Sequence, residues 1–585
     1  MKRQITSLTL AAALITATLS GCSGSSQSGT STASASTASA SASASAASTA
    51  GTPKFSDIQF PENLPAGITQ ADNTKYGYDD LSKHYTLSIL QTNYGTPALS
   101  EKEDAICQYL EKKFNVTIKV QTVNQSDLKT TISTQFASGD LPDLFDIGSD
   151  NTPVGMSTAN MLDSQGLLVD ARTIYPYMPQ WCKYTTKNMI AASYNDATGN
   201  IPFITHYAIQ DTAWGFAIRK DWLKKFNMAE PKTEDELLAY AKACTFNDPD
   251  GDGKADTYFM TGAGGGNGFG MLGGFNTMFG NPSPRVENGK LVHPIFDGTE
   301  QKYLTFLNKL YNAKVLAPDW YTIDWSKKDT YLMNDKLGMA YYPTCLLTEY
   351  SNAKNKDIKS LNVWEWYPDA PIQGGKYAPS GNIGYMWGFT KQGFSDEGKL
   401  KRVAHMLDTM VVGGENFFRT IQGGADDEYQ AIGVKVTAPR TWKYNSDGTF
   451  YFTNSTKGDP YNNKKYDPEG IWQMYGLGVT WQRNAPTGED EFQTKMNVES
   501  NKSADVLNKY PRWSNDGLLC NVPIETLAPG LSDWVNAQEL NFVTNKRSLS
   551  TDWSNYQKEW LNKGGRKIIE AQAKKLKVPT PDYAK

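Results

Sequence analysis

The sequence predicts an α/β fold of at least two lobes. Short runs with the two-residue periodicity of strands alternate with runs in which apolar residues recur every three or four positions, as in helices. Such alternation is typical of parallel sheets that are covered by helices on both faces. More than 500 of the 585 residues follow a low-complexity N-terminal region, which is too many for a single hydrophobic core.

Residues 1–22 have the organisation of a bacterial secretion signal. Two basic residues follow Met1 and residues 5–19 are uncharged, but this run is too short to remain as a transmembrane helix. It ends in Leu-Ser-Gly-Cys, which resembles a lipobox, the pattern after which a cysteine is acylated. We therefore expect a lipid anchor, with palmitate as a typical acyl group, on Cys22 at the extracellular face of the cell membrane. A plain signal peptide with an incidental cysteine is the alternative.

Residues 23–53 are expected to form a disordered tether. They consist almost only of Ser, Ala, Thr and Gly. Such a composition buries too little apolar surface to offset the entropy of ordering the chain. A flexible coil of this length spans roughly 30 Å, which suits a link between a membrane and a folded body.

The composition excludes several kinds of function. A formal net charge of −4 gives no basic footprint for nucleic acid. Five cysteines remain besides Cys22, and they lack the spacing of metal ligands. Cys107 and Cys244 fall on the apolar faces of predicted helices and are expected to pack in the protein core. No Gly-Lys pair precedes Ser or Thr, so a P-loop is absent. The four histidines lie in no nucleophile-elbow or zinc-protease motif.

The first α/β region begins with a predicted strand at 85–93. Two further strands follow at 116–123 and 141–149, and a helix separates each pair. Ser100 and Glu103 have the spacing of a capping box that opens the first helix. The apolar stripes of the two helices are Ile106, Leu110 and Phe114, and Leu128, Ile132 and Phe136.

A second α/β region starts near residue 201. An apolar run leads into a helix that carries Trp222, Leu223 and Phe226. A second capping box, Thr233 with Glu236, opens a further helix with an apolar stripe. That helix leads directly into an acidic stretch, and the residues after the stretch (TYFMTG) have the pattern of a strand.

The acidic stretch 247–258 reads NDPDGDGKADTY and resembles a calcium-binding loop. With Asp248 at position 1 of an EF-hand register, Gly253 falls at position 6, where a sharp turn is needed, but position 12 is Phe259 rather than Glu. The metal ligands expected on this register are Asp248, Asp250, Asp252, the Lys254 carbonyl and Asp256. A turn rich in Asp and Gly with solvated carboxylates is the alternative.

Five segments, taken in order, resemble the extracellular solute-binding proteins of bacterial ABC transporters. This is solute-binding protein family 1, the maltose-binding-protein-like family, and the resemblance is to its large lipoprotein branch in Gram-positive bacteria. The segments are ASGDLPDLFDIG (137–148), WGFAIRKDWLKKFNMAEPKTEDELLAYAKA (214–243), NDKLGMAYY (334–342), NIGYMWGFTKQ (382–392) and NFVTNKRSLSTDWSNYQKEWLNKGGRKIIEAQ (541–572).

The resemblance implies a two-lobed periplasmic-binding-protein-like fold. Each lobe would contain a mainly parallel sheet flanked by helices, and a hinge would join the lobes. The expected lobes comprise 54–205 with 384–430, and 206–383 with 431–585. The protein would act as a monomer that captures its ligand between the lobes and delivers it to the transmembrane permease subunits of an ABC importer. Some members of the family carry a structural Ca²⁺ at the acidic stretch, completed by a Glu where this chain has Thr257.

An oligosaccharide is the expected ligand. Sugars present C–H faces that aromatic rings cover and hydroxyl groups that polar side chains pair with. The expected ligand-binding residues stand near strand ends and crossings, in the segment before the return to the first lobe, or elsewhere in the second lobe: Asn93, Asp150, Tyr207, Asp211, Trp214, Trp366, Trp387, Trp472 and Tyr475. Core packing is the alternative for each tryptophan, because the chain has 15 of them. The Gly-rich run 262–270 lacks phosphate-loop spacing and is expected to be a flexible loop of the cleft.

Two other functions remain open from the sequence. A surface lipoprotein that degrades polysaccharides would need paired carboxylates, whose separation in space the sequence does not reveal. A peptide-binding lipoprotein would use the same capture mechanism with a different cleft chemistry. We expect a binding protein without enzymatic activity.

Overall fold

The computed structural model describes residues 76–93, 105–124, 127–148, 155–182, 185, 187–207, 214–343, 346–367, 376, 383–410, 433, 442–444, 450–452, 490–508, 511–513 and 519–585. The expected signal, Cys22, the tether and the Ser100–Glu103 capping box lie outside them.

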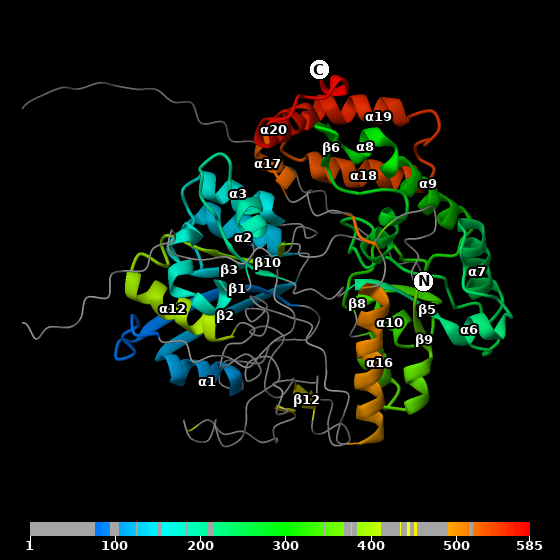
Figure 1. Cartoon of the computed structure of the whole chain (residues 1–585), viewed down its shortest axis with the longest axis horizontal. Coiled ribbons are helices and arrows are strands. Elements are labelled where there is room, and N and C mark those ends of the chain that lie inside the picture. The colour runs from blue at the N-terminus through cyan, green and yellow to red at the C-terminus, as the bar shows by residue number, and fades with distance from the viewer. Residues whose placement is uncertain are drawn as a thin grey trace, which may run out of the picture. The chain divides into compact units, whose positions relative to one another are not determined.

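The first lobe is organised by a five-stranded sheet in the order β2-β1-β3-β10-β4 (Figure 1). β1 pairs in parallel with both β2 and β3, whereas β10 runs antiparallel to β3 and to β4. The strands are β1 (Tyr85–Asn93), β2 (Val116–Asn124), β3 (Leu144–Gly148), β4 (Ile204–Tyr207) and β10 (Ile383–Phe389). Because β10 opposes both of its neighbours, β4 is parallel to β3, and the carboxyl ends of β1, β3 and β4 lie at one edge of the sheet.

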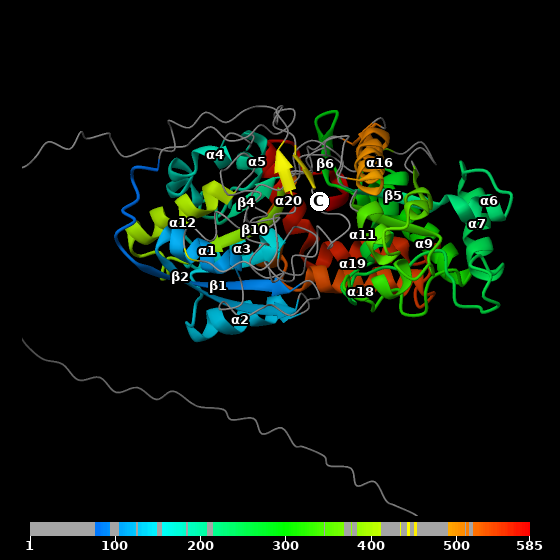
Figure 2. The same ribbon diagram turned by 90° about the horizontal axis from the view of Figure 1, so that it is seen from below.

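Helices cover both faces of this sheet, and Figure 2 shows α2 and α12 on opposite sides of β1 and β2. One core combines residues of α1 and α12 with Leu87 and Ile89, and the other combines residues of α2 and α3 with Leu90. α2 ends at Gly139, whose left-handed φ of 78° closes the last turn. The helices of this lobe are α1 (Ala105–Phe114), α2 (Leu128–Ser138), α3 (Gly155–Ser164), α4 (Pro179–Cys182), α5 (Lys187–Ala192) and α12 (Glu397–Met410).

The second lobe has a three-stranded sheet in the order β8-β5-β9. Its strands, β5 (Trp214–Arg219), β8 (Met339–Pro343) and β9 (Trp364–Tyr367), pair antiparallel throughout. Here the described strands differ from the mainly parallel sheet that the resemblance implied. The acidic stretch is also followed by two isolated bridges, Tyr258 with Leu337 and Met260 with Leu316, rather than by the strand expected there. Residues 257–262 are buried except for the partly exposed Tyr258, so this segment belongs to the core without forming a continuous ladder.

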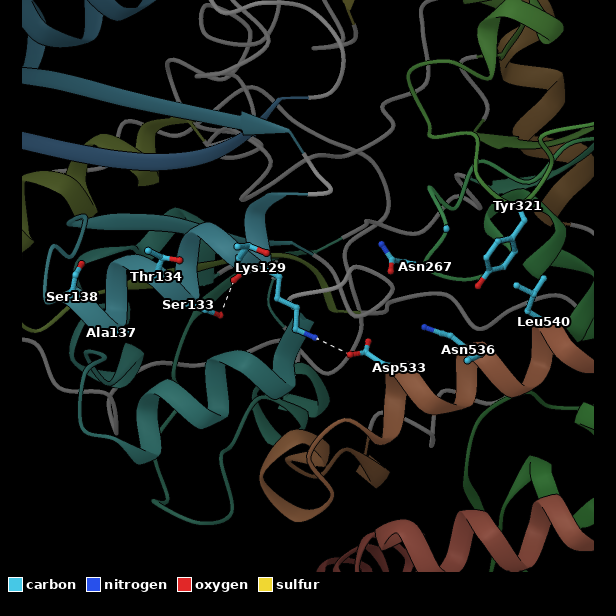
Figure 3. Close-up of a pocket in the computed structure, with 13 residues that line it drawn as sticks. Lys129, Ser133, Thr134, Ala137, Ser138, Asn267, Tyr321, Asp533, Asn536 and Leu540 are labelled. Atoms are coloured by element: carbon cyan, nitrogen blue, oxygen red, sulfur yellow. Dashed lines mark hydrogen bonds and ion pairs between the residues drawn. The ribbon is translucent and has the colours of Figure 1, made fainter. Parts of the chain in front are cut away.

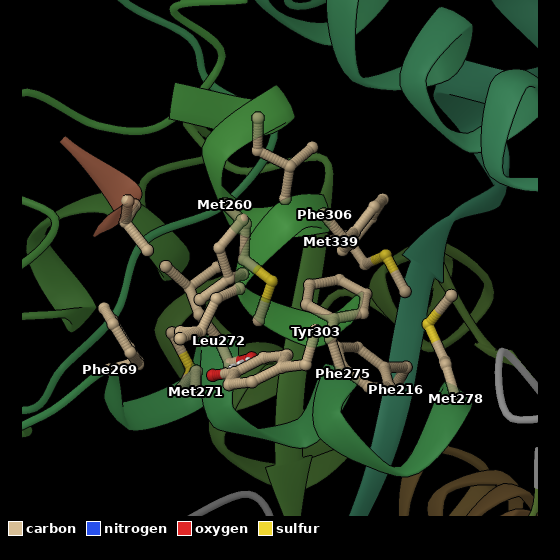
Figure 4. Packing of buried hydrophobic residues seen from close by; sticks show 14 of the residues in the cluster. Phe216, Met260, Phe269, Met271, Leu272, Phe275, Met278, Tyr303, Phe306 and Met339 are labelled. Atoms are coloured by element: carbon tan, nitrogen blue, oxygen red, sulfur yellow. Dashed lines mark hydrogen bonds between the residues drawn. The ribbon is translucent and has the colours of Figure 1, made fainter. Parts of the chain in front are cut away.

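A large core of aromatic and sulfur-containing residues supports the second lobe (Figure 4). Phe216 of β5 stacks on Phe275, whose ring also contacts Phe306. α7 begins at the capping box of Thr233 and Glu236, which the sequence predicted and the structure confirms. The helices here are α6 (Lys220–Lys225), α7 (Glu234–Phe246), α8 (Pro294–Asp297), α9 (Thr299–Asn312), α10 (Asp329–Leu332), α11 (Leu346–Ala353), α16 (Glu491–Asn508), α17 (Ile524–Leu527), α18 (Leu531–Val543), α19 (Trp553–Trp560) and α20 (Arg566–Leu576).

Several short elements complete the description. Two further antiparallel strand pairs are β6 (Arg285–Glu287) with β7 (Lys290–Val292) and β11 (Trp442–Tyr444) with β12 (Phe450–Phe452), and 3-10 helices include η5 (Gly270–Met278).

Cys107 and Cys244 are fully buried, which confirms the prediction that both belong to the core. None of the helices in the described ranges is both long and apolar enough to cross a bilayer.

The described strand ends mark two points at which the chain leaves one sheet for the other. β4 ends at Tyr207 in the first sheet and β5 begins at Trp214 in the second. β9 ends at Tyr367 in the second sheet and β10 begins at Ile383 in the first. The edge of the first sheet that holds the carboxyl ends of β1, β3 and β4 therefore also holds the strand ends at which the chain leaves this sheet and returns to it, where Ile383 pairs with Tyr207.

Candidate functional site

A cavity of about 1150 Å³ opens between α2 of the first lobe and α18 of the second. Figure 3 shows the Lys129 side chain reaching from α2 toward Asp533 of α18, and the two charged groups are 4.0 Å apart. The lining residues from the first lobe are Lys129, Thr130, Ser133, Thr134, Ala137 and Ser138, and those from the second are Gly266, Asn267, Tyr321, Asp533, Asn536, Ala537 and Leu540. Both lobes therefore contribute hydroxyl groups to the lining, and the second lobe adds the amides of Asn267 and Asn536.

The Gly-rich run positions one wall of this cavity through close backbone packing. Gly265 donates its N–H to the Ile323 carbonyl and Gly266 donates to the Tyr321 carbonyl, each at 2.9 Å. A Cβ at Gly264 would meet the Gly268 carbonyl oxygen at 2.3 Å, so no larger residue fits there without displacement. The run thus turns tightly and presents Gly266 and Asn267 to the cavity. Its close packing differs from the flexible loop that the sequence suggested.

Tyr321 contributes a neutral hydroxyl to the same wall. Burial is the main cause that raises the pKa of this phenol, and the Gly268 backbone lowers it in part. The hydroxyl therefore remains protonated across the physiological range and can both donate and accept hydrogen bonds. Lys129 and Asp533 balance each other in charge, so the cavity favours a neutral polar ligand.

A second feature is an aromatic shelf made of Trp214, Trp325 and Tyr341. The Trp214 ring centroid lies 5.5 Å from that of Trp325 and 5.6 Å from that of Tyr341. Trp214 is 39% exposed, one of few large apolar side chains so open to solvent in the described ranges. An exposed ring held by two others is a rigid surface on which the apolar face of a ligand can stack.

Buried charge fixes the base of the shelf. The Lys328 ammonium lies 3.8 Å from the centroid of Trp325 and donates hydrogen bonds to the Tyr342 hydroxyl and to Asp329. The Tyr342 hydroxyl in turn donates to Glu349 at 2.5 Å. Lys328 has 1% of its side chain exposed, so this arrangement holds Trp325 in one orientation without reaching solvent itself.

The predicted ligand-binding residues are placed in three ways. Trp214 is exposed on the shelf, whereas Trp366 and Trp387 pack in the cores of the second and first lobes, with 7% and 1% exposure. Asn93 and Tyr207 end β1 and β4, at the same edge of the first sheet. Four predicted residues lie outside the described ranges: Asp150, Asp211, Trp472 and Tyr475.

The sequence reasoning missed most of the residues that line these features. Tyr341 is the one partly exposed residue of β8, and it stands opposite Phe216 of β5. That position could have been found from strand alternation within 339–343. The cavity residues on α18, Asp533 and Asn536, are spaced three apart on a helix, but only the fold brings them opposite α2.

The acidic stretch forms the turn that its spacing predicted. One carboxylate oxygen from each of Asp248, Asp250 and Asp252 lies within 4.8 Å of the others. Asp248 accepts hydrogen bonds from the backbone N–H groups of Gly251 at 3.0 Å and Gly253 at 3.1 Å. Gly253 has a φ of 78°, which suits a glycine at the sharp turn of position 6.

A lysine from elsewhere in the chain contacts this turn. The Lys336 ammonium lies 2.7 Å from Asp250, 3.4 Å from Asp252 and 2.8 Å from Asp256. Burial acts to raise the pKa of Asp250, but the hydrogen bond and charge of Lys336 outweigh it, and the net pKa is below its usual value. Hydrogen bonds from the side chain and backbone of Lys254 lower the pKa of Asp252.

The residues after Asp256 supply no charged ligand to the turn. The Thr257 hydroxyl donates to the Cys244 carbonyl at 2.9 Å, and its side chain is buried. Phe259, at position 12 of the register, is fully buried in the core. Of the ligands that the sequence predicted, the structure brings together the carboxylates of Asp248, Asp250 and Asp252, and a calcium shell built on these three needs further oxygen ligands for the remaining positions.

Comparison with known proteins places these features in a family. The family model for bacterial extracellular solute-binding proteins matches residues 95–392, about half of the chain. The Bacillus subtilis lipoprotein LipO is 27% identical over 56% of this chain, and the polygalacturonan/rhamnogalacturonan-binding protein YtcQ of the same organism is 28% identical over 39%. The matches span only 64% and 45% of those relatives' lengths.

Solved structures share the fold. The ABC-transporter substrate-binding protein FusA of S. pneumoniae, in complex with kestose, superposes with a TM-score of 0.60 at 17% identity, covering 84% of this chain and 99% of FusA. The alginate-binding protein AlgQ2, solved without calcium ion, has a TM-score of 0.59 at 16% identity, covering 85% and 98%. The family is one of binding proteins rather than enzymes. The chain belongs to the bacterial extracellular solute-binding proteins.

Proposed function

We propose that this chain is the substrate-binding subunit of an ABC importer and that it captures an oligosaccharide between its two lobes. The observation that carries the proposal is the cavity lined from both sides, by α2 and by α18. A ligand that contacts both walls favours the closed arrangement by its differential affinity, which is the basis of capture by hinge closure. Delivery to the transmembrane permease subunits would follow from the closed form.

The chemistry of the two features supports a sugar ligand. The cavity offers uncharged hydroxyl and amide groups, including Ser133, Asn267 and Asn536, which match the rim of a sugar. The aromatic shelf offers an exposed ring, which matches its C–H face. At about 1150 Å³ the cavity is at the upper end of small-molecule sites, so it has room for several sugar units. The relatives YtcQ, a binder of polygalacturonan and rhamnogalacturonan, and FusA, a fructooligosaccharide binder, point in the same direction.

Within this proposal the ligand-binding residues divide into two groups. Trp214 acts through the shelf. The proposed contacts at the crossings and strand ends are Asn93, Asp150, Tyr207 and Asp211, and those elsewhere in the second lobe are Trp472 and Tyr475. The side chains of Trp366 and Trp387 would reach a ligand only if their cores opened. The proposed lobes are 54–205 with 384–430 and 206–383 with 431–585.

The proposed cofactor is a structural Ca²⁺ in the acidic turn. Asp248, Asp250, Asp252, Asp256 and the Lys254 carbonyl would hold it, with hard oxygen ligands that Ca²⁺ prefers. Two fold neighbours support a cation of this kind, since FusA has been solved as an EF-hand mutant and AlgQ2 without calcium ion. The turn joins α7 to the core of the second lobe, so a metal there would brace the lobe and take no part in ligand chemistry.

The proposed location is the extracellular face of the cell membrane. Acylation of Cys22 would anchor the monomeric protein, and the tether would let the lobes reach the permease. The family is extracellular and LipO is named a lipoprotein, which supports this location. Mass spectrometry of the protein from the membrane fraction of an expressing Gram-positive host tests the anchor: an acylated N-terminal Cys22 is expected, and an unmodified cysteine contradicts it.

Isothermal titration against pectic, fructose-based and other plant oligosaccharides tests the binding function. We expect at least one oligosaccharide to bind saturably and to be recovered intact. Release of shorter products would favour the polysaccharide-degrading alternative. Binding of peptides without binding of any oligosaccharide would favour the peptide-binding alternative.

A further inference from the structure

Lys336 is held beside the acidic turn by the backbone as well as by its charge. The Tyr258 N–H donates to the Lys336 carbonyl at 2.8 Å, and the Gly338 N–H donates to the Tyr258 carbonyl at 2.9 Å. These two bonds form the parallel bridge between Tyr258 and Leu337. The backbone of Lys336 is thus hydrogen-bonded to Tyr258 at the end of the turn, and its ammonium contacts the carboxylates of the turn.

The charge balance of the turn depends on this lysine. Four carboxylates lie within nine residues, and the ammonium of Lys336 contacts three of them. Two other lysines reach the turn: Lys225 donates to the backbone carbonyls of Asp248 and Pro249, at 2.7 and 3.1 Å, and these bonds involve no carboxylate. Lys254 is paired with Asp252, at 3.0 Å, and its side chain is 69% exposed. Lys336 is 20% exposed, so its ion pairs are screened less by solvent. Lys336 is therefore the main counter-charge of the turn.

An ammonium and a calcium ion cannot share this position. Calcium binds carboxylate oxygens at 2.3–2.6 Å, and the ammonium nitrogen already lies 2.7 Å from Asp250 and 2.8 Å from Asp256. Two cations bound to the same oxygens would stand within a few ångströms of each other and repel strongly. Calcium at these carboxylates would therefore favour a lysine side chain that has moved out toward solvent.

We propose that Lys336 is the resident cation of the acidic turn in the metal-free protein and that it competes with calcium. The ammonium compensates Asp250, Asp252 and Asp256, so the turn stays folded without metal. The backbone bridge at Leu337 does not depend on the ammonium and persists when the side chain leaves. The competition between Lys336 and calcium rests on the proposed calcium site. The stabilisation of the turn by Lys336 does not depend on that site.

The test compares Lys336→Met with the matched control Lys254→Met in the full chain. Thermal melting is measured in EDTA, and calcium affinity is measured by titration of calcium chloride. In EDTA we expect Lys336→Met to melt roughly 2–4 °C below wild type, because three carboxylates lose their partner. We expect it to bind calcium about tenfold more tightly than wild type, since no ammonium must be displaced. Lys254→Met should stay close to wild type in both measurements.

A second variant keeps the test decisive if Lys336→Met unfolds in EDTA. Combining Lys336→Met with Asp250→Asn removes one unpaired charge, and melting in EDTA should rise toward wild type. An unchanged melting temperature for Lys336→Met in EDTA would overturn the proposal, as would calcium affinity equal to or weaker than wild type. If no variant binds calcium, the proposed calcium site fails, and the melting temperatures in EDTA alone decide the role of Lys336.

Discussion

The buried ion pair of Arg402 and Asp79 provides the sharpest test of how the first lobe holds its N-terminal segment. Arg402 of α12 has no exposed side-chain surface, and Asp79 has 2%. The Arg402 Nε–H donates to both carboxylate oxygens of Asp79, at 2.7 and 2.8 Å. Its other nitrogens donate to backbone carbonyls of the segments 80–83 and 114–115. One side chain therefore ties residues 79–83 to α12 and to the end of α1.

Replacing Arg402 by Met leaves the Asp79 carboxylate buried, with the His405 ring nitrogen at 2.8 Å still beside it. Removing one member of a buried pair costs about 3–5 kcal/mol, because the other charge loses its compensation. We expect Arg402→Met to lower the free energy of unfolding by about that amount in urea titrations. The double variant with Asp79→Asn should lose less than the sum of the two single variants, since it leaves no unpaired charge. A loss below about 1 kcal/mol for Arg402→Met, or strict additivity, would refute this role.

Three further predictions concern stability. Burial raises the pKa of Glu300 to about 7, so the folded state keeps a proton that the unfolded state releases above pH 4.5, and stability falls as the pH rises from 4.5 to 7. Glu300→Gln should therefore melt at a higher temperature than wild type at pH 8 and at a similar temperature at pH 4. Equal melting temperatures at pH 8 would contradict this prediction. Thr233→Ala removes the capping box of α7 and should cost about 1 kcal/mol by chemical denaturation, with Thr173→Ala, an exposed hydroxyl, as the smaller control. Gly264→Ala should lower the melting temperature, whereas Gly273→Ala should leave it close to wild type, because a Cβ at Gly273 meets nothing within 4 Å. A lower melting temperature for Gly273→Ala than for Gly264→Ala would refute the packing argument for the Gly-rich run.

Local patterns in the sequence predicted the elements well where a single segment decides the outcome. The capping box at Thr233, the strand at 85–93 and the burial of Cys244 depend on neighbouring residues, and all three are confirmed. The direction of the strands in the second lobe was not available from such patterns. Alternating strands and helices usually indicate parallel pairing. In this sheet, however, β5 lies between β8 and β9, and both of these strands follow β5 by more than 100 residues in the sequence.

The candidate site was harder to predict because its parts are far apart in the sequence. Lys129 and Asp533 are about 400 positions apart, and no local spacing relates them. Lys336 likewise reaches the acidic turn across more than 80 residues. Composition alone did not distinguish the tryptophans near the crossings, whereas burial separates the exposed Trp214 from Trp366 and Trp387. The spacing of the carboxylates, in contrast, is local, and the sequence alone predicted how they converge.

Titration calorimetry of the full chain and its Trp214→Ala variant, with the tightest oligosaccharide found, tests the central claim most directly. Phe246→Ala is the matched control, because Phe246 is 60% exposed and does not belong to the aromatic shelf. We predict saturable binding by wild type and by the control, and about tenfold weaker binding by Trp214→Ala, from loss of one stacking ring. Equal affinity of Trp214→Ala and wild type would contradict the aromatic shelf as the sugar contact. Absence of binding by wild type to every oligosaccharide would contradict the proposed function.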